Sequence, residues 1–371
     1  FVIQGEGTKT LDALCLCPDL SDVSELEKVP SLWFRKGIFV KFTPYAEPVA
    51  QEDLPKELPG MAWDLLPMDK YRTANWHALS NNNDRQPFAS IYTSLGCPYN
   101  CSFCMINAPF GNNNTENVKG KPSFRYWDVD FIMSQFDEIA RRGIRNVKIA
   151  DEMFVLYPEH YVEICRKIVE KGYDFNIWSY SRINTVDDGH LELMKKAGIN
   201  WLALGIESGD ANVRKDVIKG SFKDVKIVDT VRKIQDAGIN VIGNFIFGLP
   251  EDTIETMETT LALAQELNCE FSNFYSAMAY PGSKLYLEAI ENKVELPESY
   301  EAYSQHSYEC FPMNTNFISN KEVLAFRDKA FTTYFTNKKY LDMVEKKFGI
   351  PAREEIEKMT KTKLKRKLLG D

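Results

Sequence analysis

Between residues 89 and 285 the chain alternates short apolar runs with amphipathic helical stretches, and this alternation limits the possible folds more than any other feature. Glycines follow several of the helical stretches at the position of a helix C-cap. Strand–helix units joined by short connections indicate a parallel sheet with right-handed crossovers. The apolar runs are 90–95, 146–150, 175–180, 201–206, 241–247 and 270–278, and the helical stretches are 129–142, 159–171, 189–197, 225–237 and 254–266.

The number of units distinguishes between kinds of parallel sheet. A complete eight-fold barrel takes about 250 residues, whereas residues 89–285 hold six units. The sequence therefore predicts an α/β fold with a partial (β/α)6 TIM-type barrel, and an open doubly wound sheet is the alternative. Residues 286–371 are expected to form a helical C-terminal region. Residues 21–88, which are rich in proline, aspartate and aromatic side chains, are expected to form an irregular N-terminal linker.

Composition excludes several classes of function. The chain of 371 residues has 45 Lys and Arg against 53 Asp and Glu, a net charge of -8, which disfavours broad binding to a phosphate backbone. No apolar run approaches the roughly 18 residues that span a bilayer. We therefore expect a cytoplasmic protein with no nucleic-acid partner and no membrane span. The basic cluster at residues 361–367 is interpreted as a solvated terminal helix.

Three cysteines stand close together after the first predicted strand. Cys97, Cys101 and Cys104 have the spacing C-x3-C-x2-C within TSLGCPYNCSFCMI, and active-site groups of α/β barrels lie at such strand ends. A structural zinc site needs four ligands, and all four histidines are distant in sequence. Three thiolates can hold a 4Fe-4S cluster with one iron left open. The alternative is a zinc or electron-transfer site completed by a distant cysteine such as Cys310.

This spacing, with Phe103 directly before Cys104, resembles the signature of the radical S-adenosylmethionine (SAM) superfamily. In that family the open iron chelates SAM, and reductive cleavage of SAM gives a 5'-deoxyadenosyl radical that abstracts hydrogen from the substrate. The resemblance implies an enzyme that binds a 4Fe-4S cluster and SAM. It also implies an electron donor such as flavodoxin or ferredoxin.

The resemblance extends to the ends of the second and third strands. Asp151 and Glu152 match acidic positions that accept hydrogen bonds from the SAM amino group. A helix cap is the alternative for Asp151. Ser181 and Arg182 are expected near the carboxylate or ribose of SAM, and a structural ion pair is the alternative for Arg182.

The fourth and fifth strands continue the pattern. The segment 204–209 resembles the family's G-I-E-S-G motif, which implies Glu207 near the SAM amino group or ribose and Lys219 near the SAM carboxylate. The segment 244–251 resembles the adenine-site motif, with Ile246 contacting adenine and Asn244 in place of a glycine. After the sixth strand, Pro281-Gly282 resembles the family's P-G-T turn.

The region upstream narrows the resemblance to one class. Residues 62–72 are similar to the linker that joins a cobalamin-binding domain to the barrel in the cobalamin-dependent class. The D-x-H-x-x-G segment of that domain does not occur in this sequence. Residues 1–20 are therefore interpreted as the last strand and helix of a cobalamin-binding Rossmann-like domain, most of which is expected to precede this chain in the natural protein; the alternative is a chain that lost this domain.

The class implies a reaction, although no catalytic residue is assigned. Most of its characterised members transfer a methyl group from methylcobalamin to an unactivated centre, and we expect methyl transfer here. The alternatives are cyclisation or rearrangement by the same class, or a non-catalytic iron-sulfur binding protein. The expected substrate is a small molecule, a natural product or a cell-envelope component. The pair Trp76-His77 is interpreted as buried rather than facing cobalamin or substrate, and Cys310 as an ordinary loop cysteine rather than a radical quencher.

Overall fold

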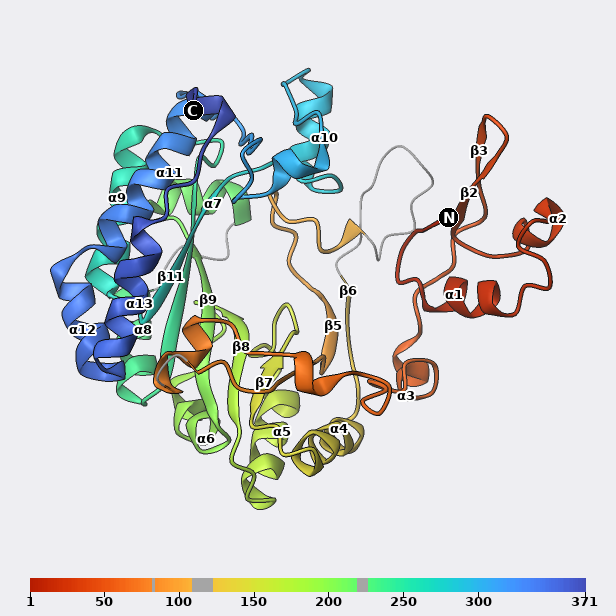
Figure 1. Ribbon diagram of the computed structural model, residues 1–371, viewed down its shortest axis with the longest axis horizontal. Coiled ribbons are helices and arrows are strands. Elements are labelled where there is room, and N and C mark those ends of the chain that lie inside the picture. The colour runs from red at the N-terminus through yellow and green to blue at the C-terminus, as the bar shows by residue number, and fades with distance from the viewer. Residues whose placement is uncertain (82–83, 109–122, 219–225) are drawn as a thin grey trace.

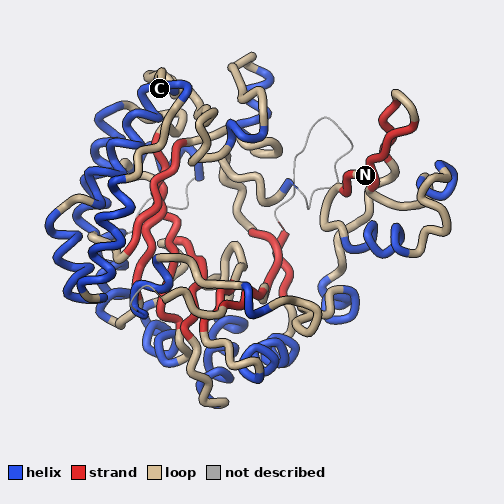
Figure 2. Tube along the Cα trace, in the orientation of Figure 1, coloured by secondary structure: helices blue, strands red, loops and turns tan. Residues whose placement is uncertain are grey.

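The computed structural model describes residues 1–81, 84–108, 123–218 and 226–371. Six parallel strands lie side by side in chain order and curve into an incomplete barrel, with helices on the outside (Figures 1 and 2). This confirms the partial barrel, because a doubly wound sheet would reverse its strand order at a switch point. The strands are β4 (Phe88–Ile91), β7 (Asn146–Ile149), β8 (Asn176–Arg182), β9 (Ile199–Glu207), β10 (Asn240–Phe247) and β11 (Phe271–Ser276).

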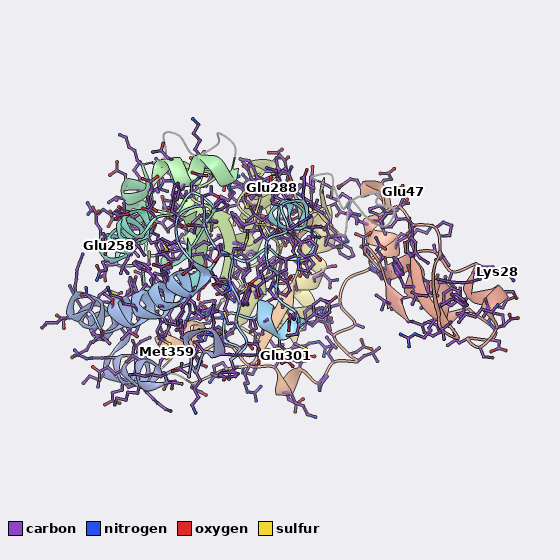
Figure 3. The ribbon with its side chains drawn as sticks, turned by 90° about the horizontal axis from the view of Figure 1, so that it is seen from above. Lys28, Glu47, Glu258, Glu288, Glu301 and Met359 are labelled. Carbon is purple, nitrogen blue, oxygen red and sulfur yellow. The ribbon has the colours of Figure 1, made fainter. Side chains whose placement is uncertain are left out.

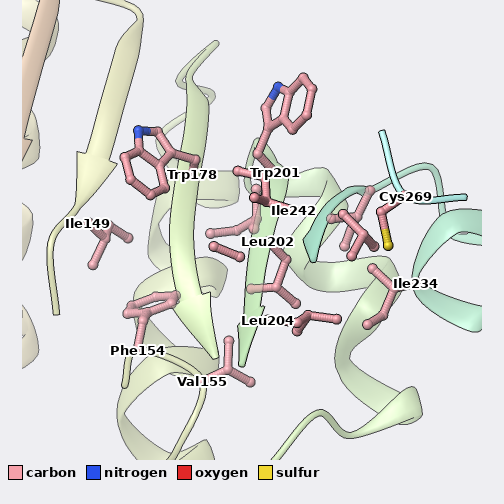
Figure 4. Packing of buried hydrophobic residues seen from close by; sticks show 14 of the residues in the cluster. Ile149, Phe154, Val155, Trp178, Trp201, Leu202, Leu204, Ile234, Ile242 and Cys269 are labelled. Carbon is pink, nitrogen blue, oxygen red and sulfur yellow. The ribbon is translucent and has the colours of Figure 1, made fainter. Parts of the chain in front are cut away.

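The helices between the strands present one apolar face to the sheet. A fully buried core is formed between sheet and helices, and Figure 4 shows part of it around Trp201, Leu202 and Ile234. A short helix after β9 was not predicted. The helices are α4 (Val129–Arg141), α5 (Pro158–Glu170), α6 (Leu191–Lys196), α7 (Ala211–Ile218), α8 (Ile227–Asp236) and α9 (Ile254–Leu267).

The prediction of one first strand at residues 90–95 is wrong. The barrel strand β4 ends at Ile91, and the chain bends into β5 (Ser94–Cys97), which pairs antiparallel with β6 (Ser123–Tyr126). Gly96 has a φ of 83°, and a Cβ atom there would lie 2.3 Å from the Ser123 carbonyl oxygen. A glycine is therefore required for the close approach of the two strands. The cysteine motif thus begins inside a hairpin strand rather than in a loop.

The barrel stays open at β11 because side chains occupy the free edge of this strand. The guanidinium Nε of Arg327 donates to the Phe274 carbonyl at 2.8 Å. The side-chain amide of Gln305 bonds both the N–H and the carbonyl of Ser276 at 2.9 Å. Backbone groups at the edge of a sheet otherwise offer a template for another strand. These contacts satisfy the edge without a seventh strand.

The C-terminal region is helical, as predicted, but its last residues are not. It contains α10 (Lys284–Glu291), α11 (Asn320–Phe335), α12 (Lys338–Phe348) and α13 (Ile350–Lys361). The basic cluster continues as irregular chain to a short 3-10 turn at Lys367–Leu369, so the interpretation as a solvated terminal helix is wrong. Arg366 is fully buried and binds both carboxylate oxygens of Asp328 at 2.9 Å. Among the described residues, no helix has the length and apolar composition needed to cross a bilayer.

Residues 1–44 form a small unit set to one side of the barrel (Figure 1; Figure 3, around Lys28). Strand β1 (Val2–Ile3) pairs antiparallel with β2 (Leu32–Lys36), which pairs with β3 (Phe39–Phe42). The helices α1 (Thr8–Cys15) and α2 (Val23–Leu26) complete it, with a small apolar core of their own. This sheet spans the expected boundary at residue 20. The origin of residues 1–20 in a cobalamin-binding domain stays a prediction.

One ion pair ties this unit to the barrel. Glu6 and Arg125 are joined at 2.6 Å, and their side chains are 12% and 11% exposed. Arg125 lies on β6, the partner of the strand that carries Cys97. Residues 45–81 then cross the barrel with one short helix, α3 (Leu54–Glu57), and 3-10 turns.

Trp76 and His77 close the end of the barrel where the strands begin. The Trp76 ring lies 4.7 Å from the Trp178 ring and 5.3 Å from the Trp201 ring, both near strand starts. His77 is 1% exposed, and burial lowers its pKa to about 4. The pair therefore packs in the interior, as the sequence interpretation favoured, at the opposite end of the barrel from the cysteines.

Replacing Trp76 with alanine is expected to lower the free energy of unfolding by about 3 kcal/mol, near the lower end for aromatic-to-alanine changes, because Trp76 is only partly buried. Urea denaturation without oxygen measures this. Leu65→Ala, at a side chain that is 78% exposed, is the control and should change stability by less than about 0.5 kcal/mol. Unchanged stability in the Trp76 variant would contradict the closing role.

Candidate active site

The three cysteines lie at the end of β5, which Cys97 closes, and on the turn that follows it. Cys97 is buried, Cys101 is half-buried and Cys104 is exposed, and none forms a disulfide. The Cys104 N–H donates to the Cys101 carbonyl at 3.1 Å, which closes the turn. Burial raises the pKa of Cys97 to about 11 and that of Cys101 to about 12. A positively charged metal group would reverse these shifts, because it stabilises thiolates.

The donor set fits an iron-sulfur cluster better than a single metal ion. Across the described parts of the chain, no three His, Cys, Asp or Glu side chains are grouped so that they could hold one ion. The thiolates of a cubane bind different irons, so their sulfur atoms need not meet at one point. Cys310 is fully buried in a separate apolar cluster with Met278 and Leu324. It packs as a core side chain, which disfavours its role as a fourth ligand.

Arg182 lies against the cysteine turn. Its guanidinium carbon is 3.7 Å from the centre of the Tyr99 ring, and Tyr99 stands between Cys97 and Cys101. The side chain is 7% exposed, so the stacking is largely shielded from water and correspondingly strong. The positive charge lowers the pKa of Cys101 against the larger effect of burial. Arg182 therefore places a cation beside the thiols, and its expected position near the carboxylate or ribose of SAM stays a prediction.

Glu152 supplies a buried carboxylate on the same side. Its Oε2 atom has no hydrogen-bond partner among the described residues. Burial raises the pKa of Glu152 to about 7, although the N–H groups of Glu152 and Gly96 lower it in part. Its charge in turn raises the pKa of Cys97. The Oε2 atom of Glu152, beside the cysteines, can accept hydrogen bonds from an ammonium group.

Glu207 is the second buried carboxylate. It ends β9 with a φ of 67°, which is unusual for a residue other than glycine. The register of β9 against β10 shifts at this point, and such a bulge re-aims a side chain. A Cβ atom on Gly205 would lie 2.6 Å from Glu207 Oε1, so Gly205 leaves room for the carboxylate. Burial raises the pKa of Glu207 to about 7, and Arg182 partly opposes this.

Asp151 has a different role from either one expected. It is fully buried, and its oxygens accept hydrogen bonds at 2.6 Å from the Thr93 N–H, the Thr93 hydroxyl and the Ser94 hydroxyl. The next helix begins at Pro158, so Asp151 does not cap it. The carboxylate instead holds the bend between β4 and β5. The capping role is wrong, and these three hydrogen bonds together with the full burial of Asp151 disfavour its contact with SAM.

Four further residues were predicted to belong to the site. The Ser181 hydroxyl bonds the Arg182 carbonyl and the Thr185 hydroxyl, both at 3.0 Å, so it is engaged locally. Ile246 is 9% exposed on β10, beside Tyr275 of β11. Phe103 is partly buried against the apolar core. Lys219 lies outside the described residues.

Sequence reasoning missed a buried carboxylate, Asp252. It is fully buried and accepts hydrogen bonds from the N–H groups of Gly248 and Leu249 at 3.0 and 2.9 Å. Burial raises its pKa to about 6, and these bonds partly oppose the shift. The carboxylate fixes the turn that follows the adenine-like motif. The signal for it was the acidic residue just before Thr253, which caps α9.

The Pro281-Gly282 turn packs on the cysteine segment. Gly282 has a φ of 93°, and a Cβ atom there would lie 2.7 Å from the Ala108 Cβ. The Leu285 N–H at the start of α10 donates to the Ser102 carbonyl at 3.0 Å. The segment after the last strand therefore supports the turn that bears the cysteines.

The raised pKa of Glu207 makes a prediction for the cluster-free protein. Between about pH 4.5 and 7 this carboxyl is ionised in the unfolded chain but protonated in the folded chain. The free energy of unfolding therefore falls as pH rises through this range, and the whole loss of stability is present above pH 7. Glu207→Gln should raise the free energy of unfolding at pH 8 by about 1–3 kcal/mol, and by much less at pH 5.

Urea denaturation at the two pH values measures this difference. Glu258→Gln, at an exposed position on α9 (Figure 3), is the matched control and should show no such dependence. An equal effect of Glu207→Gln at both pH values would mean that Glu207 is ionised in the folded protein at pH 5.

Comparison with known proteins gives a family match and two relatives. Residues 91–264 match the family model of the radical SAM superfamily. "Uncharacterized methyltransferase PH0819" of Pyrococcus horikoshii is 27% identical over 344 residues, which cover 92% of this chain and 68% of that protein. "Anaerobic magnesium-protoporphyrin IX monomethyl ester cyclase" of Rubrivivax gelatinosus is 24% identical over 306 residues, which cover 81% of this chain and 49% of that protein.

A solved structure matches almost the whole chain. The cobalamin-dependent SAM radical enzyme OxsB, with aqua-cobalamin and SAM bound, gives a TM-score of 0.64 at 16% identity. The match covers 96% of this chain and 55% of OxsB. This chain therefore shares the fold of OxsB and spans about half of its length.

Proposed function

We propose that this chain belongs to the radical SAM superfamily, whose family model matches residues 91–264, and that Cys97, Cys101 and Cys104 hold its 4Fe-4S cluster. The observation that carries the proposal is the grouping of three free thiols at the end of β5 and on the turn after it, with Arg182 and two partly buried carboxylates around them. When bound, the cluster supplies the electron for reductive cleavage of SAM to a 5'-deoxyadenosyl radical. An electron donor such as flavodoxin or ferredoxin belongs to the same proposal.

The surrounding side chains have separate tasks in this proposal. Glu152 and Glu207 accept hydrogen bonds from the ammonium group of SAM, and this pairing would lower both pKa values from about 7, because an opposite charge favours the ionised carboxyl. Arg182 offsets negative charge on the thiolates and on the SAM carboxylate. The backbone of Ile246 contacts adenine in this proposal. The proposed role of Lys219 at the SAM carboxylate rests on the sequence motif alone.

We also propose that the reaction is a cobalamin-dependent methyl transfer. Two observations support it: the methyltransferase name of the Pyrococcus relative, and the cobalamin and SAM bound together in OxsB, which shares this fold. Cyclisation is the second candidate, and the name of the Rubrivivax relative favours it. The two reactions differ in whether a methyl group leaves SAM.

Loss of one ligand tests the cluster proposal. After anaerobic reconstitution, the unaltered chain should bind about four irons and form 5'-deoxyadenosine from SAM when dithionite is added. Cys101→Ala should lose most of the iron and all of the 5'-deoxyadenosine, because the cluster then lacks one of its three ligands. Cys15→Ala, which removes an exposed thiol, is the control and should keep both. Full iron content in Cys101→Ala would contradict the assignment of Cys101 as a cluster ligand.

Product analysis tests methyl transfer without knowledge of the substrate. The full chain is incubated anaerobically with SAM, a strong reductant and hydroxocobalamin, and S-adenosylhomocysteine and methylcobalamin are measured. Methyl transfer to reduced cobalamin should form both in equal amounts, above the level without protein. If 5'-deoxyadenosine forms but cobalamin adds no S-adenosylhomocysteine, the chain is a radical SAM enzyme and the methyl-transfer proposal fails.

A further inference from the structure

A cavity of about 750 Å³ lies between β11, α11 and the last residues of the chain. It is at the open edge of the barrel, where the chain after α13 passes alongside α11 (Figure 1). Its lining is mainly apolar and includes Phe271, Phe331 and Met359. Binding sites for small molecules are typically concave, apolar and marked by a few polar groups.

The charged groups of this cavity are mostly positive. Arg327, Lys329 and Lys363 line it, and the acidic residue among the lining side chains is Asp328. Asp328 is already paired with Arg327 and with the buried Arg366, at 2.8 and 2.9 Å. The negative charge of Asp328 is therefore compensated by these two arginines. Lys329 and Lys363 are exposed and leave the outer rim cationic.

The electrostatics of His306 agree with a positive rim. His306 also lines the cavity. Burial lowers its pKa, and the charges of Arg327 and Arg366 lower it further, although Asp328 opposes them. The same positive potential that disfavours a second cation favours an anion.

One lining residue, Tyr275, is a neighbour of a residue of the candidate active site. Tyr275 lines the cavity and stands next to Ile246 in the pairing of β11 with β10. Burial raises the pKa of Tyr275 to about 12, and the nearby charge of Glu207 contributes to this shift. The cavity therefore leads from a cationic rim, along apolar side chains, to a residue beside the proposed SAM pocket.

We propose that this cavity is the substrate site and that the substrate is an amphipathic anion. Its apolar body lies against Phe271, Phe331 and Met359, with the reacting carbon towards Tyr275, and its anionic head group lies between Lys329 and Lys363. This assignment rests on the proposed radical SAM function, since that function makes Glu207 and Ile246 the neighbours of SAM. The barrel is open at β11, so a molecule longer than the interior can be held with its head group outside.

Binding of three probes with the same alkyl chain tests the proposal. Octanoate, octan-1-ol and octyltrimethylammonium are titrated into the full chain by calorimetry, with and without the reconstituted cluster. Octanoate should bind best and octyltrimethylammonium worst. Absence of octanoate binding, or equal binding of all three, overturns the proposal.

Two variants and a matched control locate the binding. Lys363→Gln should weaken octanoate about fivefold and leave octan-1-ol unchanged, as expected for one partly exposed charge pair. Thr360→Trp, which fills the lining, should weaken both. Lys358→Gln removes an exposed charge on α13, five residues before Lys363 and outside the lining, and should change neither. If Lys358→Gln matches Lys363→Gln, the binding is non-specific and the site is wrong.

These measurements distinguish failure of the substrate-site proposal from failure of the proposed radical SAM function. Probe binding needs neither SAM nor electrons, so its failure leaves 5'-deoxyadenosine formation untouched. Failure of SAM cleavage with intact octanoate binding would instead remove the proposed function and keep the cavity as a binding site. Thermal unfolding of each variant by circular dichroism ensures that a loss of binding does not reflect a loss of fold.

Discussion

The buried carboxylate of Asp151 is the contact on which the site depends. It follows the second barrel strand and binds Thr93 and Ser94, which follow the first. Removing a buried acceptor of three hydrogen bonds leaves several donors unsatisfied, each at a cost of about 1–3 kcal/mol. These bonds fix the bend after Ile91, where β4 ends and the chain turns into β5, the strand that carries Cys97. The sheet and the cysteine turn are therefore joined by a side chain that needs no contact with SAM.

Most of the barrel was predictable because its elements repeat a local pattern. The strands from β7 to β11 lie within two residues of the apolar runs, and glycines with positive φ end the helices as expected. Cys97, Glu152, Arg182 and Glu207 were found because the family places them at strand ends. Their convergence could not be derived from spacing alone, since it depends on the curvature of the sheet.

The errors arise where distant residues decide the local structure. The run at 90–95 resembles one strand, but a carboxylate more than 50 residues later divides it. The terminal basic cluster resembles a solvated helix, but Arg366 is neutralised by Asp328 on α11. A charged side chain is almost never fully buried unless it is paired, and the pairing partner is not visible in the nearby sequence. Asp252 is a different case, because its partners Gly248, Leu249 and Thr256 all lie within four residues of it.

The Glu6–Arg125 ion pair has a consequence for how such chains evolve. Removing either partner of a largely buried pair leaves an uncompensated charge, which commonly costs 3–5 kcal/mol. Because Arg125 belongs to the hairpin that bears Cys97, the N-terminal unit cannot be exchanged between homologues as an independent module. A chimaera that takes one side of this contact must take the other as well. Replacing residue 6 or residue 125 alone would therefore disturb the hairpin that bears Cys97.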